Sequence, residues 1–411
     1  MDTLYPRCAG IDVHKNTVVV CVRCADRPGK GFEEVRTFST MTRDLLALSD
    51  WLAGHGATHV AMESTGVYWK PVFNILAGRV KVILVNAEHI KQVPGRKTDV
   101  KDCQWIAQLL QHGLLKASFV PSEPIRELRD LTRQRTQLIQ ERSAAANRIQ
   151  KVLEDANVKL ASVATDVLGV SGRDMLEALI AGETDPAKLA ELARKRLREK
   201  LPELQLALQG RVTDHHRFLL RMHLDHVAHL EELIARLGAR IEEKMAPFAQ
   251  AQQRLETIPG VSQRVAETVV AEIGVDMKQF PSAGHLASWA GMCSGNNESA
   301  GKRRSGRITK GDRWLKRILV QAAWAASHTK GTYLAAQYRR LSKRRGRKRA
   351  LVAVGHTLLV IVYHVLKRGT TYAELGADFL DRLEPERLTR QLVKRLESLG
   401  HKVTLEAGHA A

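Results

Sequence analysis

The segment from Cys8 to Val22, CAGIDVHKNTVVVCV, limits the possible folds more than any other part of the chain. Ile11 and the valines that follow it predict buried β-strands, yet Asp12 lies among them. A lone buried carboxylate costs several kcal/mol unless it is paired, hydrogen-bonded or bound to a metal. The fold must therefore supply Asp12 with a partner.

The first 122 residues alternate between strand-like and helix-like patterns. Four apolar segments predict strands, at residues 8–13, 16–22, 58–63 and 80–86. Three amphipathic segments predict helices, at residues 43–56, 70–79 and 98–113. A hairpin followed by alternating strands and helices predicts a mixed α/β sheet.

Three further acidic residues are predicted to face this sheet. Glu63 ends a predicted strand, where functional groups gather at the edge of α/β sheets. Asp99, Asp102 and Ile106 follow at i, i+3 and i+7, so both acids extend the apolar face of one helix. Together with Asp12 they would repel one another strongly, and divalent cations relieve that repulsion. Oxygen ligands favour Mg²⁺ or Mn²⁺, and two such ions clamp the reacting oxygens of a phosphodiester. The alternative is a set of helix-capping acids beside one hydrogen-bonded Asp12.

An aspartate in a strand followed by a turn also opens actin-like sugar kinases. Those folds need glycine directly after the acid so that the backbone can approach a phosphate, whereas Val13, His14 and Lys15 follow here. The sequence also has no Gly-rich phosphate loop of the Walker type. Both observations disfavour a kinase.

Two long polar helices are predicted in the middle of the chain, at residues 125–159 and about 212–245. Each carries a narrow apolar stripe with heptad-like spacing. The first stripe contains Leu128, Leu131, Leu138, Ala145, Ile149 and Val152, and the second contains Leu220, Val227, Leu230, Ile234, Leu237 and Ile241. The pattern predicts an antiparallel or intersubunit coiled coil, with small helices between its two arms.

The second long helix is rich in histidine. The residues are His215, His216, His223, His226 and His229. A spacing of three is compatible with zinc, but no Cys or acid completes a closed site, and a solvated helix face is the simpler interpretation.

A mostly helical third region begins at about residue 251. Residues 255–274 predict a helix, a Pro-Gly-Val turn and a second helix. This order resembles a helix-hairpin-helix, whose second N-terminus binds phosphate, and is equally typical of an ordinary turn. Residues 350–366 are the most apolar run, too short for a bilayer span and interrupted by two histidines, so they predict a buried core helix.

The charge of the chain is unusual and concentrated. The formal net charge is +20 and the pI is about 10.0. Residues 300–349 contain 17 Lys or Arg residues and one acid, Asp312. Such a surface indicates a polyanionic partner, chiefly nucleic acid, with membrane headgroups as the lesser alternative.

Ser299 lies at the start of this basic region, followed by two small residues, Ala300 and Gly301. A serine hydroxyl needs a base, a metal or strong charge stabilisation to act as a nucleophile, and clustered guanidiniums stabilise a reacting phosphate. Alternatively the segment is a basic loop that grips phosphates, and Ser294 and Ser305 compete for the nucleophilic role. The residues predicted to bind nucleic acid are Lys302, Arg303, Arg304, Arg307, Lys310, Arg339, Arg340, Arg344 and Arg345.

Five motifs stand in an order that resembles one family. They are GIDVHK, MESTG, KTDVKD, IPGV and NNESAGKRRSGRITKGDRWLKR. The chain resembles the DEDD transposases of a bacterial insertion-sequence family, whose members are described as bridge-RNA-guided recombinases. The resemblance covers Ala9 to about Gly369, and no role is assigned to the residues beyond it.

The resemblance implies a RuvC-like (RNase H-fold) domain at residues 1–122, a coiled coil with a helical insertion at 123–250 and a helical transposase domain at 251–411. It implies that Asp12, Glu63, Asp99 and Asp102 bind Mg²⁺. Ser299 would attack the DNA backbone and form a covalent intermediate, in a composite site built from two subunits. Many members have two glycines after this serine, whereas Ala300 stands here.

The implied partners are donor and target DNA, a noncoding guide RNA and further copies of the chain, as a dimer or tetramer, with no membrane. The N-terminus lacks a signal pattern, which predicts a cytoplasmic, nucleoid-associated protein. Two rival functions stay open. A metal-only nuclease or junction resolvase would hydrolyse DNA without the serine, and a non-catalytic protein would only bind nucleic acid.

Overall fold

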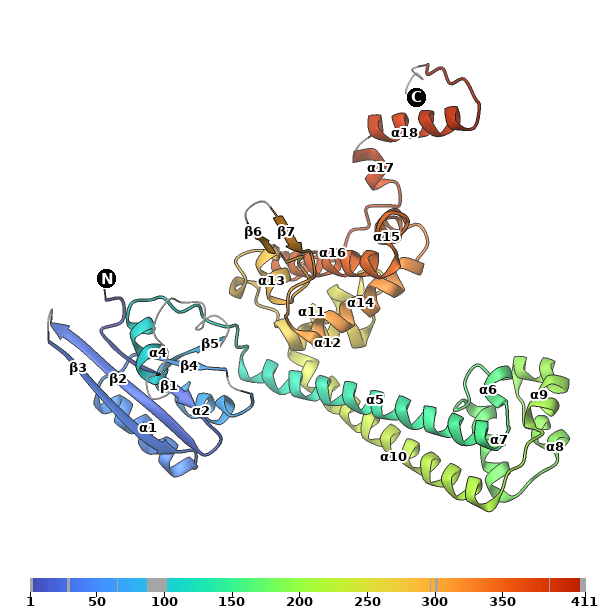
Figure 1. Ribbon diagram of the computed structural model, residues 1–411, viewed down its shortest axis with the longest axis horizontal. Coiled ribbons are helices and arrows are strands. Elements are labelled where there is room, and N and C mark those ends of the chain that lie inside the picture. The colour runs from blue at the N-terminus through green and yellow to red at the C-terminus, as the bar shows by residue number, and fades with distance from the viewer. Residues whose placement is uncertain are drawn as a thin grey trace. The chain divides into compact units, whose positions relative to one another are not determined.

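The computed structural model describes residues 3–27, 30–64, 66–86, 102–295, 297–299, 302–383 and 385–406 (Figure 1). The chain divides into two units, Met1–Val120 and Pro121–Ala411.

The first unit is built on a five-stranded mixed sheet in the order β3-β2-β1-β4-β5. Its strands are β1 (Arg7–Val13), β2 (Thr17–Arg27), β3 (Lys30–Ser39), β4 (His59–Glu63) and β5 (Lys81–Val85). Strands β1, β2 and β3 pair antiparallel, while β4 is parallel to β1 and β5 is parallel to β4. The predicted mixed α/β sheet is confirmed, and β3 is a strand that the sequence did not predict.

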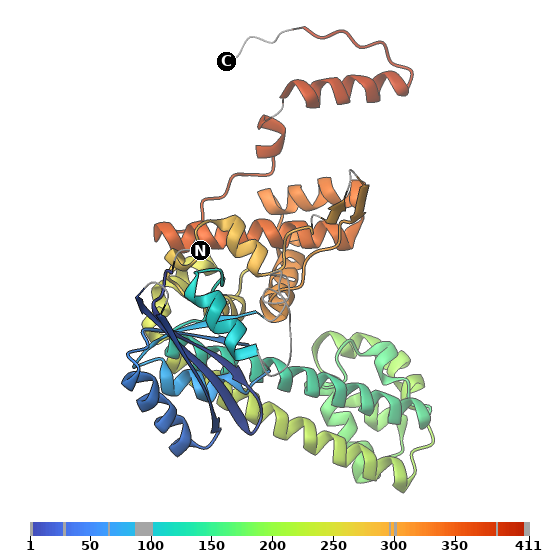
Figure 2. The same ribbon diagram turned by 60° about the vertical axis from the view of Figure 1, so that its left-hand side comes forward.

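Helices cover both faces of this sheet (Figures 1 and 2). Helices α1 (Thr42–Gly54) and α2 (Trp69–Leu76) pack on the face that carries Ile11 and Met62. Helix α4 (Asp102–Gln111) packs on the opposite face, against Cys8 and Ala61. The alternation of side chains along β1 and β4 therefore separates two apolar cores.

The second unit begins with two long helices, α5 (Glu123–Asp155) and α10 (Asp214–Met245), which lie side by side (Figure 1). The ion pair between Lys244 Nζ and Glu127 Oε2, 2.7 Å long, joins the end of α10 to the start of α5, so the pair is antiparallel. Most of the predicted stripe residues are buried, but Leu131, Val152, Ile234 and Leu237 are only half-buried.

Small helices form a separate core at the far end of this pair. They are α6 (Leu160–Val163), α7 (Val170–Ala181), α8 (Pro186–Glu191), the 3-10 helix η2 (Lys195–Lys200) and α9 (Leu201–Leu208). They correspond to the connecting helices that the sequence predicts between the two arms.

The rest of the second unit is a helical bundle around α16 (Arg347–Arg368), which contacts α11, α13, α14 and α15. By length and composition α16 could cross a membrane, and 44% of its apolar window is buried in the bundle. The surrounding elements are η3 (Ala246–Phe248), α11 (Ala249–Glu256), α12 (Gln263–Ile273), η4 (Met277–Gln279), α13 (Ala283–Trp289), α14 (Arg313–His328) and α15 (Tyr333–Arg345). Helices α17 (Phe379–Leu383) and α18 (Pro385–Ser398) follow.

Candidate active site

Two of the predicted acids lie at the same edge of the sheet. Strands β1 and β4 run parallel with Ile11 paired to Met62, so Asp12 and Glu63 follow side by side at the carboxyl ends of the two strands. Side chains in register share one face of a sheet. Asp12 and Glu63 therefore project toward the face that α4 covers.

Gly10 brings the third acid to the same place. A Cβ atom at Gly10 would lie 2.2 Å from the carbonyl oxygen of Cys103 and 2.3 Å from the nitrogen of Ala107, so α4 rests directly on β1. Further along, the Cys8 thiol donates to the Ala107 carbonyl oxygen at 3.7 Å, which makes the helix antiparallel to the strand. Asp102, the first residue of α4, therefore lies at the Asp12 end of β1.

The electrostatics agree with this placement. Burial is the main cause that raises the pKa of the Cys103 thiol, and the negative charge of Asp12 raises it further. The Asp12 side chain is 18% exposed, and its Oδ2 atom lies 3.1 Å from His14 Nε2. His14 was not predicted to be a partner of Asp12, although its position two residues further along the chain was the available signal.

Asp99 lies outside the described residues. Within the part of the chain that the structure describes, no group of three or more His, Cys, Asp or Glu side chains is gathered closely enough to hold a metal ion. The donor chemistry of Asp12, Glu63 and Asp102 nevertheless fits a hard divalent cation, because all three are carboxylates at one end of one face. The fold thus brings the carboxyl-bearing positions together without closing their side chains around an ion.

Ser299 lies in a β-hairpin of the second unit. Strands β6 (Asn297–Ser299) and β7 (Lys302–Ser305) pair antiparallel, with Ser299 opposite Lys302. The pairing continues toward the base, where the Gly295 nitrogen donates to the Arg307 carbonyl oxygen at 2.8 Å. The backbone therefore places Ser299 at the end of β6. The side chains of Ser299 and of residues 302–304 are not among the described side chains.

The base of this hairpin is closed by two glycines. A Cβ atom at Gly311 would lie 2.3 Å from the nitrogen of Gly291, whose φ of +68° favours glycine. The next residue, Asp312, accepts hydrogen bonds from the nitrogens of Trp314 (2.9 Å) and Leu315 (2.8 Å) and so caps α14. The hairpin is thus followed directly by the capped N-terminus of α14.

Asp312 also belongs to a network of charges between α5, α12 and α14. Arg133 Nη2 donates to Asp312 Oδ2 at 2.9 Å, and the same guanidinium holds the fully buried Glu272 through two bonds of 2.7 Å. Arg129 Nε lies 3.1 Å from Glu272 Oε2. Burial raises the pKa of Glu272, and its guanidinium partners oppose that rise. The network links the base of the hairpin to α5. It was not predicted from the sequence, because charged side chains on a helix are usually exposed to solvent.

The predicted nucleic-acid-binding residues whose side chains are described all lie on the surface. Arg307 and Lys310 are exposed after β7, and a second group is exposed in the C-terminal half of α15. This second group consists of Arg339, Arg340, Arg344 and Arg345. Such surfaces bind phosphate backbones strongly, with a marked salt dependence and without base specificity.

A carboxylate-bearing sheet edge in the first unit and an exposed arginine-rich surface in the second are features typical of proteins that act on nucleic acids, and the family comparisons identify the class as transposases. Residues 9–158 match a family model of IS110-type DEDD transposases, and residues 252–339 match a model described as the transposase IS116/IS110/IS902 family. The chain belongs to the IS110 family of DEDD transposases.

Similar proteins come from several bacteria. A "Probable family 20 transposase" of Pseudomonas aeruginosa is 27% identical over 76% of this chain and 85% of its own length. The "Transposase for insertion sequence element IS1111A" of Coxiella burnetii is 25% identical over 76% of this chain and 79% of its own length. The "Insertion element IS110 uncharacterized 43.6 kDa protein" of Streptomyces coelicolor is 27% identical over 68% of this chain and 73% of its own length.

Proposed function

We propose that this insertion-sequence transposase is an RNA-guided recombinase that cuts and rejoins DNA through a covalent bond to Ser299. The observation that carries the proposal is the placement of Asp12, Glu63 and Asp102 at one end of one face of the sheet. The strand order, with an antiparallel β1–β3 meander and two parallel strands, supports an RNase H-like, RuvC-like domain.

The carboxylates would hold Mg²⁺, with Mn²⁺ as the substitute, and Asp99 is the proposed fourth ligand. When bound, the ion would supply positive charge to the reacting phosphate and favour loss of the serine proton. Asp12 is the best-placed ligand, because it is largely buried and its one described ionic neighbour, His14, is itself 57% exposed.

Ser299 is the proposed nucleophile. In the cleavage step its Oγ atom forms a bond to phosphorus while the bond from phosphorus to one bridging oxygen breaks. The serine proton leaves to solvent base, and the departing oxygen takes up a proton. The number of phosphodiester bonds is conserved, so reversal of the step with a different DNA end rejoins the strand. Arg307 and Lys310, with residues 302–304, would stabilise the charge on the phosphoryl group.

The remaining parts of the chain support this reaction. The α5–α10 pair is proposed to act as a coiled coil that joins subunits into a dimer or tetramer, between a catalytic domain at residues 1–122 and a transposase domain at 251–411. The exposed arginines of α15 would hold guide RNA and donor and target DNA. The proposed location is the cytoplasm, in association with the nucleoid.

A second candidate is a metal-only nuclease, favoured by the same acidic edge. Carboxylates of the DEDD type support metal-dependent hydrolysis by water, and such an enzyme needs no serine. The two candidates differ in whether DNA becomes attached to the protein.

A covalent-trapping experiment separates them. The protein would be co-expressed with the noncoding RNA that flanks its element, mixed with labelled matching DNA and Mg²⁺, and run on a denaturing gel. The variants are Ser299→Ala and Asp102→Asn, with Ser294→Ala as the matched control because Ser294 is an exposed serine five residues before Ser299.

The proposal predicts a protein-linked DNA band that is lost in Ser299→Ala and Asp102→Asn and kept in Ser294→Ala. Free cleaved DNA that survives Ser299→Ala but disappears in Asp102→Asn would establish the metal-only nuclease instead. Unchanged activity in Asp102→Asn would remove the acidic edge from the reaction.

A further inference from the structure

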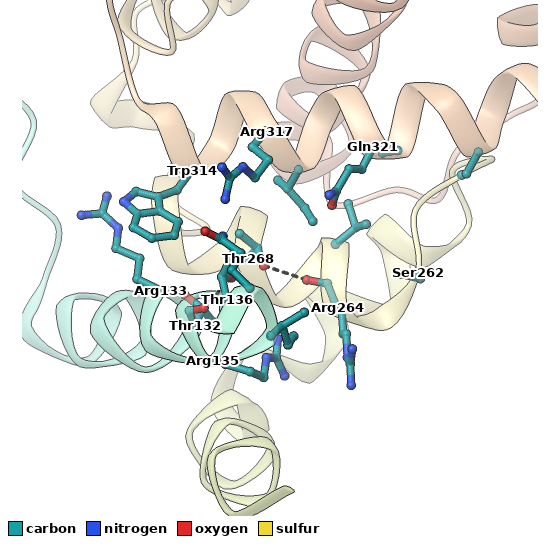
Figure 3. A pocket seen from close by; sticks show the side chains of 17 residues that line it. Thr132, Arg133, Arg135, Thr136, Ser262, Arg264, Thr268, Trp314, Arg317 and Gln321 are labelled. Atoms are coloured by element: carbon teal, nitrogen blue, oxygen red, sulfur yellow. Dashed lines mark hydrogen bonds between the residues drawn. The ribbon is translucent and has the colours of Figure 1, made fainter. Parts of the chain in front are cut away.

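A groove of about 510 Å³ opens between α5, α12 and α14 within the second unit (Figure 3). Its shape depends on Gly260, in the turn between α11 and α12, which has a φ of +84°. A Cβ atom at Gly260 would lie 2.4 Å from the carbonyl oxygen of Ala322, so this turn is pressed onto α14. The close contact leaves the first turn of α12 facing the groove.

The acidic side chains nearest the groove are already neutralised within the protein. Glu267 accepts a 2.6 Å hydrogen bond from Arg135 Nη2, and both side chains are nearly inaccessible. Glu272 and Asp312 are both held by Arg133. These carboxylates therefore contribute little negative charge to a ligand in the groove.

Two cations on the rim remain available to a ligand. Arg264 and Arg317 both line the groove and both are exposed. Among the described residues, neither guanidinium has a hydrogen-bond or ion-pair partner. In Figure 3, Arg317 and Gln321 extend from α14 toward the helices on the other side of the groove, and the Arg264 side chain points away from them. The partial positive charge of the α12 N-terminus adds to the same field. The rim of the groove is consequently positively charged.

The floor of the groove is apolar and its walls carry hydrogen-bonding groups. Ile139, Val265 and Ile318 contribute branched aliphatic side chains, while Gln140 and Gln321 contribute amides with both donors and acceptors. Volumes of this order are typical of small-ligand sites. A phosphate on each arginine, a flat base on the floor and base edges against the amides match the chemistry of one nucleotide and its two flanking phosphates.

We propose that this groove holds a single unpaired nucleotide of a bound nucleic-acid strand. An unpaired nucleotide fits the observations better than a duplex, because only an unstacked base can enter a space between helices. The proposal rests on nucleic-acid binding by this transposase, but it is independent of the metal site and of Ser299.

Binding of single strands tests the proposal with the full-length protein in EDTA, so that cleavage does not interfere. The probes are fluorescent oligo-U and oligo-dT, which distinguish RNA from DNA, and a duplex of the same length. The charge variant is Arg264→Gln with Arg317→Gln. Its matched control is Arg196→Gln with Lys200→Gln, two exposed cations in η2 that remove the same charge. Ala325→Phe fills the groove from an exposed position on α14 without changing the charge.

The charge variant should weaken single-strand binding by on the order of tenfold for each arginine. It should also reduce the dependence of log K on log salt by about 1.4, because two phosphate contacts are lost. Ala325→Phe should weaken binding severalfold and leave the salt dependence unchanged. The control variant and the duplex should show no comparable effect.

Equal losses in the charge variant and its control would overturn the proposal, and so would unchanged binding by Ala325→Phe. A groove variant that alters the sedimentation coefficient but not oligonucleotide binding would assign the groove to a second copy of the chain instead. Because covalent trapping does not enter this experiment, failure here leaves the proposed recombination chemistry untouched.

Discussion

Replacing Gly10 by alanine should move α4 away from the sheet. The added methyl group would lie 2.2 Å from the Cys103 carbonyl oxygen and 2.3 Å from the Ala107 nitrogen, both backbone atoms of the helix. Heavy atoms in favourable contact stand about 3.5 Å apart. Rotation of a side chain cannot relieve this clash, so the helix must shift by about 1 Å or more.

The shift has a cost for stability and one for activity. Overpacking of this kind costs about 1–3 kcal/mol, so the free energy of unfolding of the N-terminal unit should fall by that amount. Asp102 moves with α4 relative to Asp12, and a displacement of about 1 Å in catalytic geometry costs about 100-fold in rate. Metal-dependent DNA cleavage should therefore fall more than the remaining folded fraction explains.

Urea unfolding and hydrogen exchange of the α4 amides measure the two effects. Gly54→Ala is the matched control, because Gly54 ends α1 in the same unit and a Cβ atom there meets nothing within 4 Å. That variant should be stabilised by about 0.4–1 kcal/mol. If Gly10→Ala unfolds like the wild type and α4 exchanges no faster, the close packing of helix and strand inferred here is wrong.

Four further outcomes are expected from other parts of the chain. Glu272→Gln leaves two arginines without their buried carboxylate and should cost about 3–5 kcal/mol of unfolding free energy in urea titrations. Burial raises the pKa of Cys8 to about 12 from an ordinary 9.0, so iodoacetamide should label the half-buried Cys24 and Cys293 before Cys8. Because the pKa of Cys8 is raised in the folded state, the neutral thiol contributes its full stability below pH 9, and this stability is lost as the pH rises toward 12. Urea denaturation at several pH values across that range measures the loss. Arg344→Gln with Arg345→Gln should reduce the salt dependence of duplex binding by about 1.8, and an unchanged slope would show that α15 does not touch phosphates.

Periodicity predicted most of the first unit because its buried strands are apolar on both faces. Strands β1, β2, β4 and β5 are of this kind. Strand β3 was not predicted, because it is an edge strand whose sequence, KGFEEVRTFS, is largely polar and exposed. Periodicity also could not predict the register that places Asp12 beside Glu63, because that register depends on which strands pair and in which direction they run.

The long helices show a different limit. Their apolar stripes predicted a paired arrangement, and α5 and α10 do pair. However, Thr132 and Arg135 are buried on α5 while the predicted stripe residue Leu131 is only half-buried. Arg135 is buried because Glu267 lies 132 residues further along the chain. Sequence spacing within one helix carries no information about such a partner.

The charge network at the hairpin base has a mechanical consequence for the helix pair. Arg133 lies one third of the way along the 33-residue α5, and the helical insertion lies at the far end of the helix. At 1.5 Å per residue the part of α5 from Arg133 to Asp155 is about 33 Å long, so a tilt of about 5° at the Arg133–Asp312 contact displaces its tip by about 3 Å. The arm works as a lever with a short end at the serine hairpin. A partner that grasps the insertion can therefore exert a large torque on the residues that hold Ser299.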